Sequence, residues 1–448
     1  MIPSHNIIII GSGISGLTIA AGLKNDNFLI LEARDRIGGR VFTSSNNLDL
    51  GAAWLHGSEN NPLNKYLDSN SLIPISNSNP WMHPENTPIK YLSNTYVIDS
   101  KVAELSGDHE AKGDHETKGD HETKGDHEAN GDHEAKGDHE AKGDHETKGD
   151  HETKGDHEAN GDHEAKGDHE AKGFECDLKS VVNQWRDLAA HISSMPNISI
   201  GEALHTINFN YNDPLIFTFI YMMEVWCGGS IQNIPTSFLQ SDEFHCALFG
   251  DYRGAHSLFK TGASTIVNAL VKTANYNIHD RIKYNQIVTS VVYGASGVEV
   301  YTRDGTKYTC EKLCITVPPG PLRDIQFTPP LDPARTKALS QIKMGSYKKV
   351  QMVFDRADVF WGAEPMVLTC DSKISGKDFY LGDGANACEQ CPYILWNNYM
   401  YSKNKPILEA VFPANNGWRL TGLTDEEIAD MVMMNLRSCY PNVAEPKA

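Results

Sequence analysis

Three glycines and one glutamate near the N-terminus have the spacing of a dinucleotide-binding site. Gly11, Gly13 and Gly16 form a G-x-G-x-x-G pattern, and Glu32 follows Gly11 by 21 residues. In a strand-to-helix turn the first glycine permits a tight bend, the second lets a pyrophosphate approach the backbone, and the third allows close helix–strand packing. A carboxylate at this spacing can accept hydrogen bonds from a ribose diol. These residues therefore predict a site for a cofactor that contains ADP.

The surrounding sequence supplies the elements that would position these four residues. Ile7 to Ile10 is an unbroken apolar run, typical of a parallel strand that is buried on both faces. Leu17 to Leu23 is an apolar helical segment, and the free N–H groups at the start of its helix would face the phosphates. Phe28 to Leu31 is a second strand that leads into Glu32. This order of strand, turn, helix, strand and acid favours a Rossmann-like domain over a glycine turn with a structural role alone.

A second glycine-rich segment follows directly. Arg34, Gly38, Gly39 and Arg40 belong to a pattern E-x-R-x-R-x-G-G-R that starts at Glu32. Guanidinium groups match phosphate oxygens in a bidentate manner, and paired glycines let the backbone come close. We therefore expect these residues to bind the cofactor, although a surface turn with solvated arginines is the alternative.

This pattern, together with GAAWLHG at 51–57, resembles the flavin-dependent amine oxidases, the family of polyamine oxidases, monoamine oxidases and lysine-specific histone demethylases. The resemblance implies that the cofactor is FAD, with its pyrophosphate at the second glycine turn. It also implies that the 51–57 loop lies against the flavin, which places Gly51, Ala52 and Trp54 at the cofactor.

The middle of the chain extends the resemblance. The segment LFKTGASTIVNALV, at 258–271, is similar to the glycine turn and helix that return the family's chain to its FAD domain. Arg281 to Val292, Gly297 to Thr302 and Lys307 to Ile315 are predicted strands of an antiparallel meander. Val288 resembles a family residue whose backbone contacts adenine, and an ordinary strand valine is the alternative.

Lys349 is the first candidate for catalysis. The segments VPPGPLRDIQFTPPL at 317–331 and MGSYKKVQMVF at 344–354 resemble the family's VPxGxL and GxxxKVxxxF elements. The resemblance implies that Lys349 bonds a water next to flavin N5, where a cation stabilises the charge of the cofactor. Strand alternation would point the adjacent Lys348 to the other face.

His56 and Glu224 are two further candidates. His56, within GAAWLHG, can hydrogen-bond substrate or flavin, or modulate amine protonation, and a structural histidine is equally compatible with the sequence. Glu224, within YMMEVWCGG, resembles an acid that the polyamine branch of the family carries in its substrate domain. Its apolar neighbours indicate burial, which would demand a partner for the carboxyl group.

A repeat of eleven hexads, GDHE(A/T)(K/N), occupies residues 107–172. It contains no large apolar side chain, so it cannot bury enough surface to offset the entropy of ordering, and we expect it to be disordered. Its eleven Asp, eleven Glu and nine Lys give −13 of the net charge of −19, which leaves −6 for the other 382 residues. The folded part is thus only mildly acidic, and this balance predicts no nucleic-acid partner.

The eleven His of the repeat offer weak, collective ligands for Zn²⁺, Ni²⁺ or Cu²⁺. A fixed metal site needs preorganised ligands, so we expect a solvated spacer and no metal site. A predicted strand at Asn94 to Asp99 and a predicted helix at Asp177 to Ser193 flank the repeat, which indicates that it loops out of a folded body.

The cysteines and the hydropathy pattern indicate an intracellular protein. Of nine Cys, Cys388 and Cys391 have CxxC spacing, which is more often incidental than redox-active or metal-binding. The sequence shows no signal peptide and no long apolar span. We therefore expect no membrane contact and, by default, a cytoplasmic location.

The C-terminal region carries a capping box at Thr424 to Glu427 and an apolar helical stripe of Ile428, Met431, Val432 and Leu436. It resembles the helix that precedes the last part of the family's FAD domain. The given sequence stops at Ala448, so the resemblance implies that the segment which clamps the flavin ring is absent. Two alternatives to an active enzyme therefore stay open: a truncated, inactive paralogue that binds FAD poorly, and a His-rich metal-binding repeat on an inactive scaffold.

The sequence as a whole predicts a two-domain α/β flavoprotein in which a Rossmann-like FAD domain is discontinuous and an α+β substrate domain covers the flavin. The expected segments are the FAD-binding domain at 1–75 and 246–320, the substrate domain at 76–106, 173–245 and 321–448, and the disordered insert at 107–172.

For a complete enzyme, the resemblance implies oxidation of an amine C–N bond. A hydride would pass from the carbon next to an unprotonated amine to flavin N5, water would hydrolyse the resulting imine, and O₂ would reoxidise the flavin with release of H₂O₂. The segment GAAWLHG favours polyamine-type substrates over simple monoamines.

Overall fold

The computed structural model describes residues 5–23, 27–57, 61–76, 89–93, 174–175, 178–209, 214–241, 256–274, 276–362, 366–370, 393–440 and 443–447. All of them belong to one compact unit of the chain, formed by residues 1–99 and 169–448. The hexad repeat at 107–172, the predicted strand at 94–99 and the Cys388–Cys391 pair lie outside the described residues.

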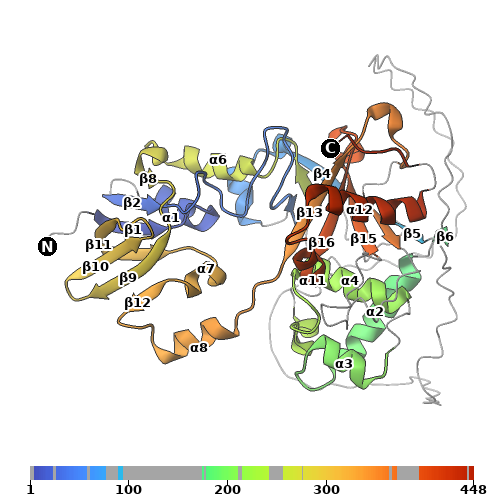
Figure 1. Ribbon diagram of the computed structural model, residues 1–448, viewed down its shortest axis with the longest axis horizontal. Helices are drawn as coiled ribbons and strands as arrows, with labels where there is room; N and C mark the ends of the chain where they lie inside the picture. Colours follow the sequence, from blue (N-terminus) through green and yellow to red (C-terminus); the bar gives the residue numbers. More distant parts are fainter. Residues whose placement is uncertain are drawn as a thin grey trace, which may run out of the picture. The chain divides into compact units, whose positions relative to one another are not determined.

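The first sheet has seven strands in the order β12-β9-β10-β11-β1-β2-β8. At its centre β1 (His5–Ile10) pairs in parallel with both β2 (Phe28–Leu31) and β11 (Lys307–Ile315). Figure 1 shows the N-terminal strands, in blue, beside strands from the middle of the chain, in yellow. The other strands are β8 (Ile282–Lys283), β9 (Val288–Gly294), β10 (Gly297–Thr302) and β12 (Gln326–Thr328).

Two helices pack together against this sheet. α1 (Ile14–Gly22) follows β1 after the glycine turn, and α6 (Ser264–Thr273) contacts it. Leu17 of α1 and Leu270 of α6 are almost fully buried in one apolar cluster with Ile9 and Ile30 of the strands. The strand, turn, helix and strand predicted for the N-terminus are present in that order, and the fold is mixed α/β.

The meander differs in one place from its sequence-based prediction. β9, β10 and β11 are antiparallel neighbours as expected, but the single strand predicted at Arg281 to Val292 is interrupted. β8 pairs in parallel with β2, and β9 begins only at Val288. The intervening backbone bonds elsewhere, because Gln286 N donates to Glu32 O at 2.8 Å and Asn285 N donates to Arg34 O at 3.0 Å.

The second sheet has six strands in the order β13-β16-β15-β14-β5-β6. A large apolar cluster joins it to helices that lie within residues 178–227 and 425–439. Its strands are β13 (Tyr347–Val353), β16 (Ile407–Pro413), β15 (Tyr393–Asn398), β14 (Met366–Cys370), β5 (Ile89–Ser93) and β6 (Phe174–Glu175).

Tyr221 fixes one helix to this sheet, because its hydroxyl accepts a hydrogen bond from Leu395 N and donates one to Val411 O, both at 2.8 Å. The helices that accompany the second sheet, shown in green and red in Figure 1, are α2 (Leu178–Ser193), α3 (Ile200–Thr206), α4 (Pro214–Cys227), α10 (Tyr399–Lys403), α11 (Ala414–Arg419) and α12 (Asp425–Cys439). α2 matches the predicted helix at 177–193, and the predicted capping box at Thr424 and Glu427 starts α12.

A third, three-stranded sheet pairs distant segments of the chain. β7 (His256–Phe259) lies between β3 (Trp54–Leu55) and β4 (Leu72–Ser76). The short helices are η1 (Pro62–Tyr66), η2 (Ser69–Ser71), η5 (Thr236–Gln240), η6 (Ile278–Arg281), α7 (Pro319–Arg323), α8 (Pro333–Gln341) and η7 (Arg356–Asp358).

The first sheet extends further along the sequence than the boundary expected at residue 320. β12, at 326–328, pairs in parallel with β9, so the chain leaves this sheet only after Thr328. Among the described helices, none is both long enough and apolar enough to cross a membrane.

Candidate active site

Gly11, Gly13 and Gly16 lie in the turn between β1 and α1, and each has a different steric environment. Gly11 has a φ of 99°, which lies in the left-handed region that favours glycine. A Cβ on Gly16 would lie 2.0 Å from the carbonyl oxygen of Gly11, so no larger residue fits there. A Cβ on Gly13 would meet no heavy atom within 4 Å. Space is therefore open beside Gly13, where the sequence pattern places a pyrophosphate.

The carboxylate of Glu32 is buried and holds this turn. Its Oε2 accepts hydrogen bonds from the backbone N and the Oγ of Ser12, at 2.7 and 2.6 Å, and its Oε1 accepts one from Arg34 N at 2.9 Å. A carboxylate has about four lone-pair positions. Three are used by these donors, which leaves one for a further donor such as a ribose hydroxyl.

The second glycine turn packs directly on the first. Gly38 N donates to Ser12 O at 2.9 Å, and Gly38 and Gly39 both have positive φ, of 96° and 60°. A Cβ on Gly39 would lie 3.2 Å from the Cα of Gly13, which is a tight contact with backbone. The two turns therefore form one continuous glycine surface.

The three arginines of the second turn, Arg34, Arg36 and Arg40, differ in their contacts. Arg34 and Arg36 each donate to the carbonyl oxygen of Gly39 at 3.1 Å, so both hold the turn. Arg36 also lies 4.1 Å from the centre of the Phe42 ring, in a cation–π contact. The side chain of Arg40 is exposed, so it is accessible to a phosphate group.

The segment 51–57 begins against this turn. Ala52 N donates to Arg40 O at 3.2 Å, and a Cβ on Gly51 would lie 2.0 Å from that oxygen. Further along, the rings of Trp54 and His56 are stacked with centroids 6.0 Å apart, and His56 lies 5.2 Å from Trp226 of α4. His56 therefore lies beside two tryptophan rings, one from its own segment and one from α4.

Val288 is buried at the start of β9 and pairs with Thr302 of β10. The segment before it is bonded to the backbone of Glu32 and Arg34, as described above. The segment before β9 therefore lies beside the backbone of Glu32, the residue that the sequence assigns to the ribose.

Lys349 lies on β13, with its ammonium group enclosed by the protein. Its Nζ is 3.4 Å from the carbonyl oxygen of Asp49 and 3.4 Å from Oε1 of Glu409, and its side chain is 10% exposed. The adjacent Lys348 donates instead to Oγ1 of Thr421 at 2.7 Å. The two lysines therefore have separate partners, as strand alternation predicts.

Glu409 of β16 is fully buried and accepts from three neutral side chains besides pairing with Lys349. Gln351 and Asn397 donate amide hydrogens at 2.7 and 2.9 Å, and the hydroxyl of Tyr399 donates at 3.0 Å. Burial and the adjacent Glu409 carboxylate raise the pKa of Tyr399 above its usual range. Tyr399 thus remains a hydrogen-bond donor at physiological pH.

Asp49 forms a second buried ion pair, with Lys403, beside the pair of Lys349 and Glu409. Its carboxylate accepts from Thr43 Oγ1 at 2.6 Å and from Ala263 N at 2.8 Å, and it lies 3.5 Å from the ammonium of Lys403. Burial lowers the pKa of Lys403, whose side chain is 3% exposed and lies 5.2 Å from the Tyr399 ring. Asp49 therefore joins the loop before residues 51–57 to α6 and to the end of α10.

Glu224 is buried as its apolar neighbours predict, and its carboxyl group has partners. Oε1 accepts a hydrogen bond from Ile231 N at 3.1 Å. Burial raises the pKa of Glu224 to about 8, although hydrogen bonds from Ile231 and Ser230 and the charge of Arg419 oppose this shift. At neutral pH the group is therefore largely protonated, and it holds the loop that follows α4.

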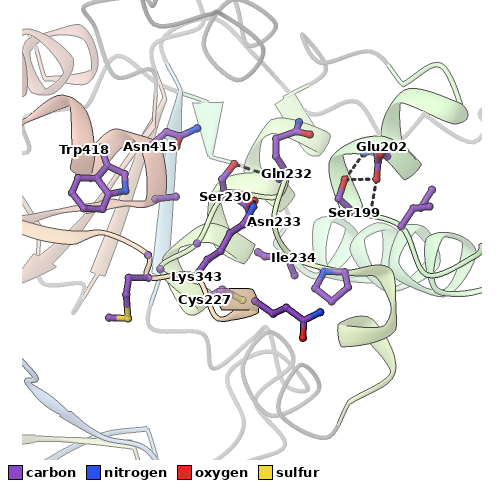
Figure 2. A pocket seen from close by; sticks show the side chains of 18 of the residues that line it. Ser199, Glu202, Cys227, Ser230, Gln232, Asn233, Ile234, Lys343, Asn415 and Trp418 are labelled. Atoms are coloured by element: carbon purple, nitrogen blue, oxygen red, sulfur yellow. Dashed lines mark hydrogen bonds between the residues drawn. The ribbon is translucent and has the colours of Figure 1, made fainter. Parts of the chain in front are cut away.

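That loop lines a cleft of about 590 Å³, which Figure 2 shows from close by. At one end Ser199 and Glu202 bond to each other as the capping box of α3. Away from that end, Lys343 donates to Oδ1 of Asn233. Trp418, which is 55% exposed, lies on the opposite wall. None of the residues that the sequence assigned to the site lines this cleft. The described residues also contain no group of three or more His, Cys, Asp or Glu side chains that could hold a metal ion.

Comparison with known proteins decides the family. A model of the flavin containing amine oxidoreductases matches residues 14–448. The chain belongs to this family. This flavin amine oxidoreductase is 27% identical over 457 aligned positions to polyamine oxidase 4 of Oryza sativa subsp. japonica. The alignment covers 98% of this chain and 74% of that relative. It is 24% identical to lysine-specific histone demethylase 2 of Homo sapiens over 60% of the chain and 31% of that protein.

Two solved structures share the fold. A putrescine oxidase double mutant redesigned in its cofactor binding superposes with a TM-score of 0.56 at 16% identity, over 100% of this chain and 84% of that chain. A triple mutant of the same oxidase gives a TM-score of 0.58 at 14% identity, over 99% of this chain and 83% of that chain. The flavin amine oxidase family predicted from the glycine turns and GAAWLHG is confirmed.

FAD is the cofactor of this oxidoreductase, and the N-terminal residues fit its ADP half. The open space beside Gly13, the N-terminus of α1 and the remaining lone pair of Glu32 offer contacts to a pyrophosphate and a ribose.

Two residues of the site were not predicted. Glu409 carries a signal, because it is an acid within the otherwise apolar strand ILEAVFP, and a buried carboxylate requires partners. Asp49 stands between Leu48 and Leu50 just before the glycine of 51–57, which is a weaker signal. Its partners Ala263 and Lys403 are more than 200 residues away, and only the fold brings them together.

Proposed function

We propose that this oxidoreductase oxidises a C–N bond of a polyamine-type amine and that Lys349 is its principal catalytic residue. The observation that carries the proposal is the 3.4 Å contact between the Lys349 ammonium and the carbonyl oxygen of Asp49. It brings a lysine of the second sheet to the loop before the 51–57 segment, 300 residues earlier in the sequence. This contact supports the proposal, because Asp49 lies two residues before GAAWLHG.

The N-terminal residues would bind the cofactor. Gly13 and the N-terminus of α1 would receive the pyrophosphate, together with the exposed guanidinium of Arg40, and Glu32 would accept from the ribose. The remaining residues proposed to position FAD are Gly11, Gly16, Arg34, Gly38, Gly39, Gly51, Ala52, Trp54 and Val288. When bound, FAD supplies the hydride acceptor for amine oxidation and passes the electrons to O₂ to form H₂O₂.

Three side chains would act on the substrate side. The Lys349 ammonium would hold a water by hydrogen bonding, and His56 would accept or donate a proton at the amine. Trp54 and Trp226 would flank the amine with aromatic faces. Glu224 is largely protonated at neutral pH, so its proposed contribution is to position the loop at Ser230 and Ile231.

The polyamine-type substrate is supported by the relatives that align over nearly the whole chain, which are named polyamine oxidases. The histone demethylase aligns over only 60% of it. His56 adds an imidazole that can accept or donate a proton beside the proposed amine.

A matched pair of lysine variants tests the proposal. The wild-type protein should show a flavin absorbance spectrum at near stoichiometric occupancy and release peroxide from spermine or an acetylated polyamine. Lys349→Met should retain the spectrum and lose kcat by roughly 10²-fold or more, the range for a positioned acid–base group. Lys348→Met is the control, because its ammonium bonds Thr421 and should leave kcat unchanged. A colourless protein that does not take up added FAD would refute the proposal, and so would an equal loss in both variants.

A further inference from the structure

We propose that Glu409 is a positioning residue that fixes the ammonium of Lys349 for the reaction. This inference rests on the proposed function, because it gives Lys349 its role. The buried acid of β16 would thus serve the reaction through its contact with a lysine on the neighbouring strand, β13.

The strand register places the two charges on one face of the sheet. Lys349 pairs with Val411, and the next residue on the same face of β13, Gln351, pairs with Glu409. Residues related in this diagonal way are within reach of long side chains. The resulting distance between Nζ and Oε1 is 3.4 Å, with the two side chains 10% and 0% exposed.

Glu409 is itself held rigidly, so it can define the position of its partner. Three neutral donors, on Gln351, Asn397 and Tyr399, bond its two oxygens from β13, β15 and α10. A carboxylate with this many directed partners has one orientation, and Lys349 completes its shell.

Stability alone gives a poor account of this pair. Replacement of a buried ion pair by apolar side chains is often neutral or stabilising, because taking two charges out of water is costly. The other members of β16 are buried and mostly apolar, so an apolar residue would suit this position. A charge kept at such a cost is better explained by its effect on the neighbouring ammonium.

The geometry also leaves Lys349 one N–H for the water proposed to bind there. An ammonium group has three N–H bonds. Within the described part of the chain, one points to Glu409 and one to the Asp49 carbonyl oxygen, which come from different elements. Two fixed acceptors set the direction of the third N–H, which is then available to a water.

The first test measures the ammonium directly and does not need a bound cofactor. Purified protein, with and without added FAD, is treated with limiting acetic anhydride, and acetylation of Lys349 is compared with that of Lys348 in the same peptide by mass spectrometry. In Glu409→Gln the Lys349/Lys348 ratio should rise severalfold, because a neutral amide holds the ammonium less tightly than a carboxylate. In Thr421→Ala, the matched control, the ratio should fall, since only Lys348 loses its partner. An unchanged ratio in Glu409→Gln overturns the proposal.

The second test asks whether Glu409 acts through Lys349. Glu409→Gln should lower the rate of flavin reduction by the amine roughly tenfold or more, the scale of a misplaced catalytic group, at unchanged FAD occupancy and with KM little altered. Glu409→Asp should restore part of this loss. In a Lys349→Met background the same change should alter the rate by no more than about twofold, because the interaction is already gone.

The outcomes separate the two proposals. A purely structural Glu409 would lower FAD occupancy and thermal stability equally in both backgrounds, which overturns the inference. A Glu409→Gln variant that labels more readily but reduces flavin at the wild-type rate also overturns it. If the wild-type protein binds no FAD, the proposed function fails, and the labelling ratio still decides whether Glu409 fixes Lys349. If Glu409→Gln does not fold, Glu409→Asp provides both measurements.

Discussion

The Oε2 atom of Glu32 lies 2.6 Å from the hydroxyl oxygen of Ser12 and 2.7 Å from its backbone nitrogen. One oxygen at the end of β2 thus holds the turn that follows β1. Its second oxygen holds the start of the next turn through Arg34 N. Glu32 therefore links the two glycine turns before any cofactor binds, in addition to the ribose contact that its sequence position predicts.

Replacing Glu32 by alanine should weaken both the apoprotein and its hold on FAD. Hydrogen bonds to a charged acceptor contribute about 1.5–3 kcal/mol each and are not additive, so we expect a loss of about 3 kcal/mol in the free energy of unfolding. Urea denaturation of the apoprotein measures this loss, and titration with FAD measures the affinity. Asp35→Asn is the control, because Asp35 is an exposed acid of the same segment. A Glu32→Ala apoprotein as stable as wild type would contradict the linking role.

Alanine at Gly16 should impair folding, whereas alanine at Gly13 should impair only FAD binding. The added Cβ at Gly16 would lie 2.0 Å from a backbone oxygen, so Gly16→Ala should fold poorly or not at all. At Gly13 the backbone has a φ of −70° and the Cβ meets nothing within 4 Å, so the apoprotein should keep its thermal stability. FAD affinity of Gly13→Ala should nevertheless fall by roughly tenfold or more, because the methyl group occupies the space proposed for the pyrophosphate.

Differential scanning fluorimetry, with and without added FAD, checks both glycine variants. The expected result for Gly13→Ala is an unchanged melting temperature without FAD and a smaller rise when FAD is added. Undiminished stabilisation by FAD in this variant would show that the pyrophosphate does not lie beside Gly13.

The glycine turns could be predicted from the sequence because their constraints are local. The positive φ of Gly11 and the close approaches of Gly16 to Gly11 O and of Gly38 to Val41 O arise within a few residues, and the spacing reflects them. The same holds for the separate partners of Lys348 and Lys349, which follow from strand alternation.

The acidic partners of the site could not be predicted in this way. Glu409 and Asp49 reach Lys349 through strand register and loop packing, and no spacing along the chain encodes these contacts. The strand predicted at 281–292 failed for a related reason. Its alternating pattern was present, but the backbone at 285 and 286 bonds to the segment after β2 instead of continuing a ladder.

Lys403 and Lys405 offer a second matched pair of lysines. Lys403 is 3% exposed and bonds Asp49 and the carbonyl oxygen of Asn47, whereas Lys405 donates to Asn46 at the exposed end of the same loop. Lys403→Met leaves a buried carboxylate without its cation, so the free energy of unfolding should fall by about 3 kcal/mol. Lys405→Met should cost about 0.5 kcal/mol or less, as for surface pairs. Urea denaturation compares the two, and equal losses would show that Asp49 does not depend on Lys403.

Glu224 should make the stability of the protein fall as the pH rises. Burial raises its folded-state pKa to about 8, whereas the unfolded chain has the usual value near 4.5. Between these two values the folded state keeps a proton that the unfolded state has released. The stabilising contribution of protonated Glu224 is therefore complete below pH 4.5 and is lost progressively up to about pH 8, at a rate on the order of 1 kcal/mol per pH unit.

Glu224→Gln isolates this contribution, because glutamine has the shape of the protonated acid and does not titrate. The difference in free energy of unfolding between wild type and Glu224→Gln should decrease steadily from pH 5 to pH 8, as measured by urea denaturation at each pH. Glu202→Gln serves as the control, since Glu202 is exposed and its pKa is lowered by the capping hydrogen bonds from Ser199. Its effect on stability should be constant over this range, because Glu202 is ionised throughout. A difference for Glu224→Gln that does not vary with pH would mean that Glu224 titrates normally, and the loop at Ser230 and Ile231 would then be held by a carboxylate.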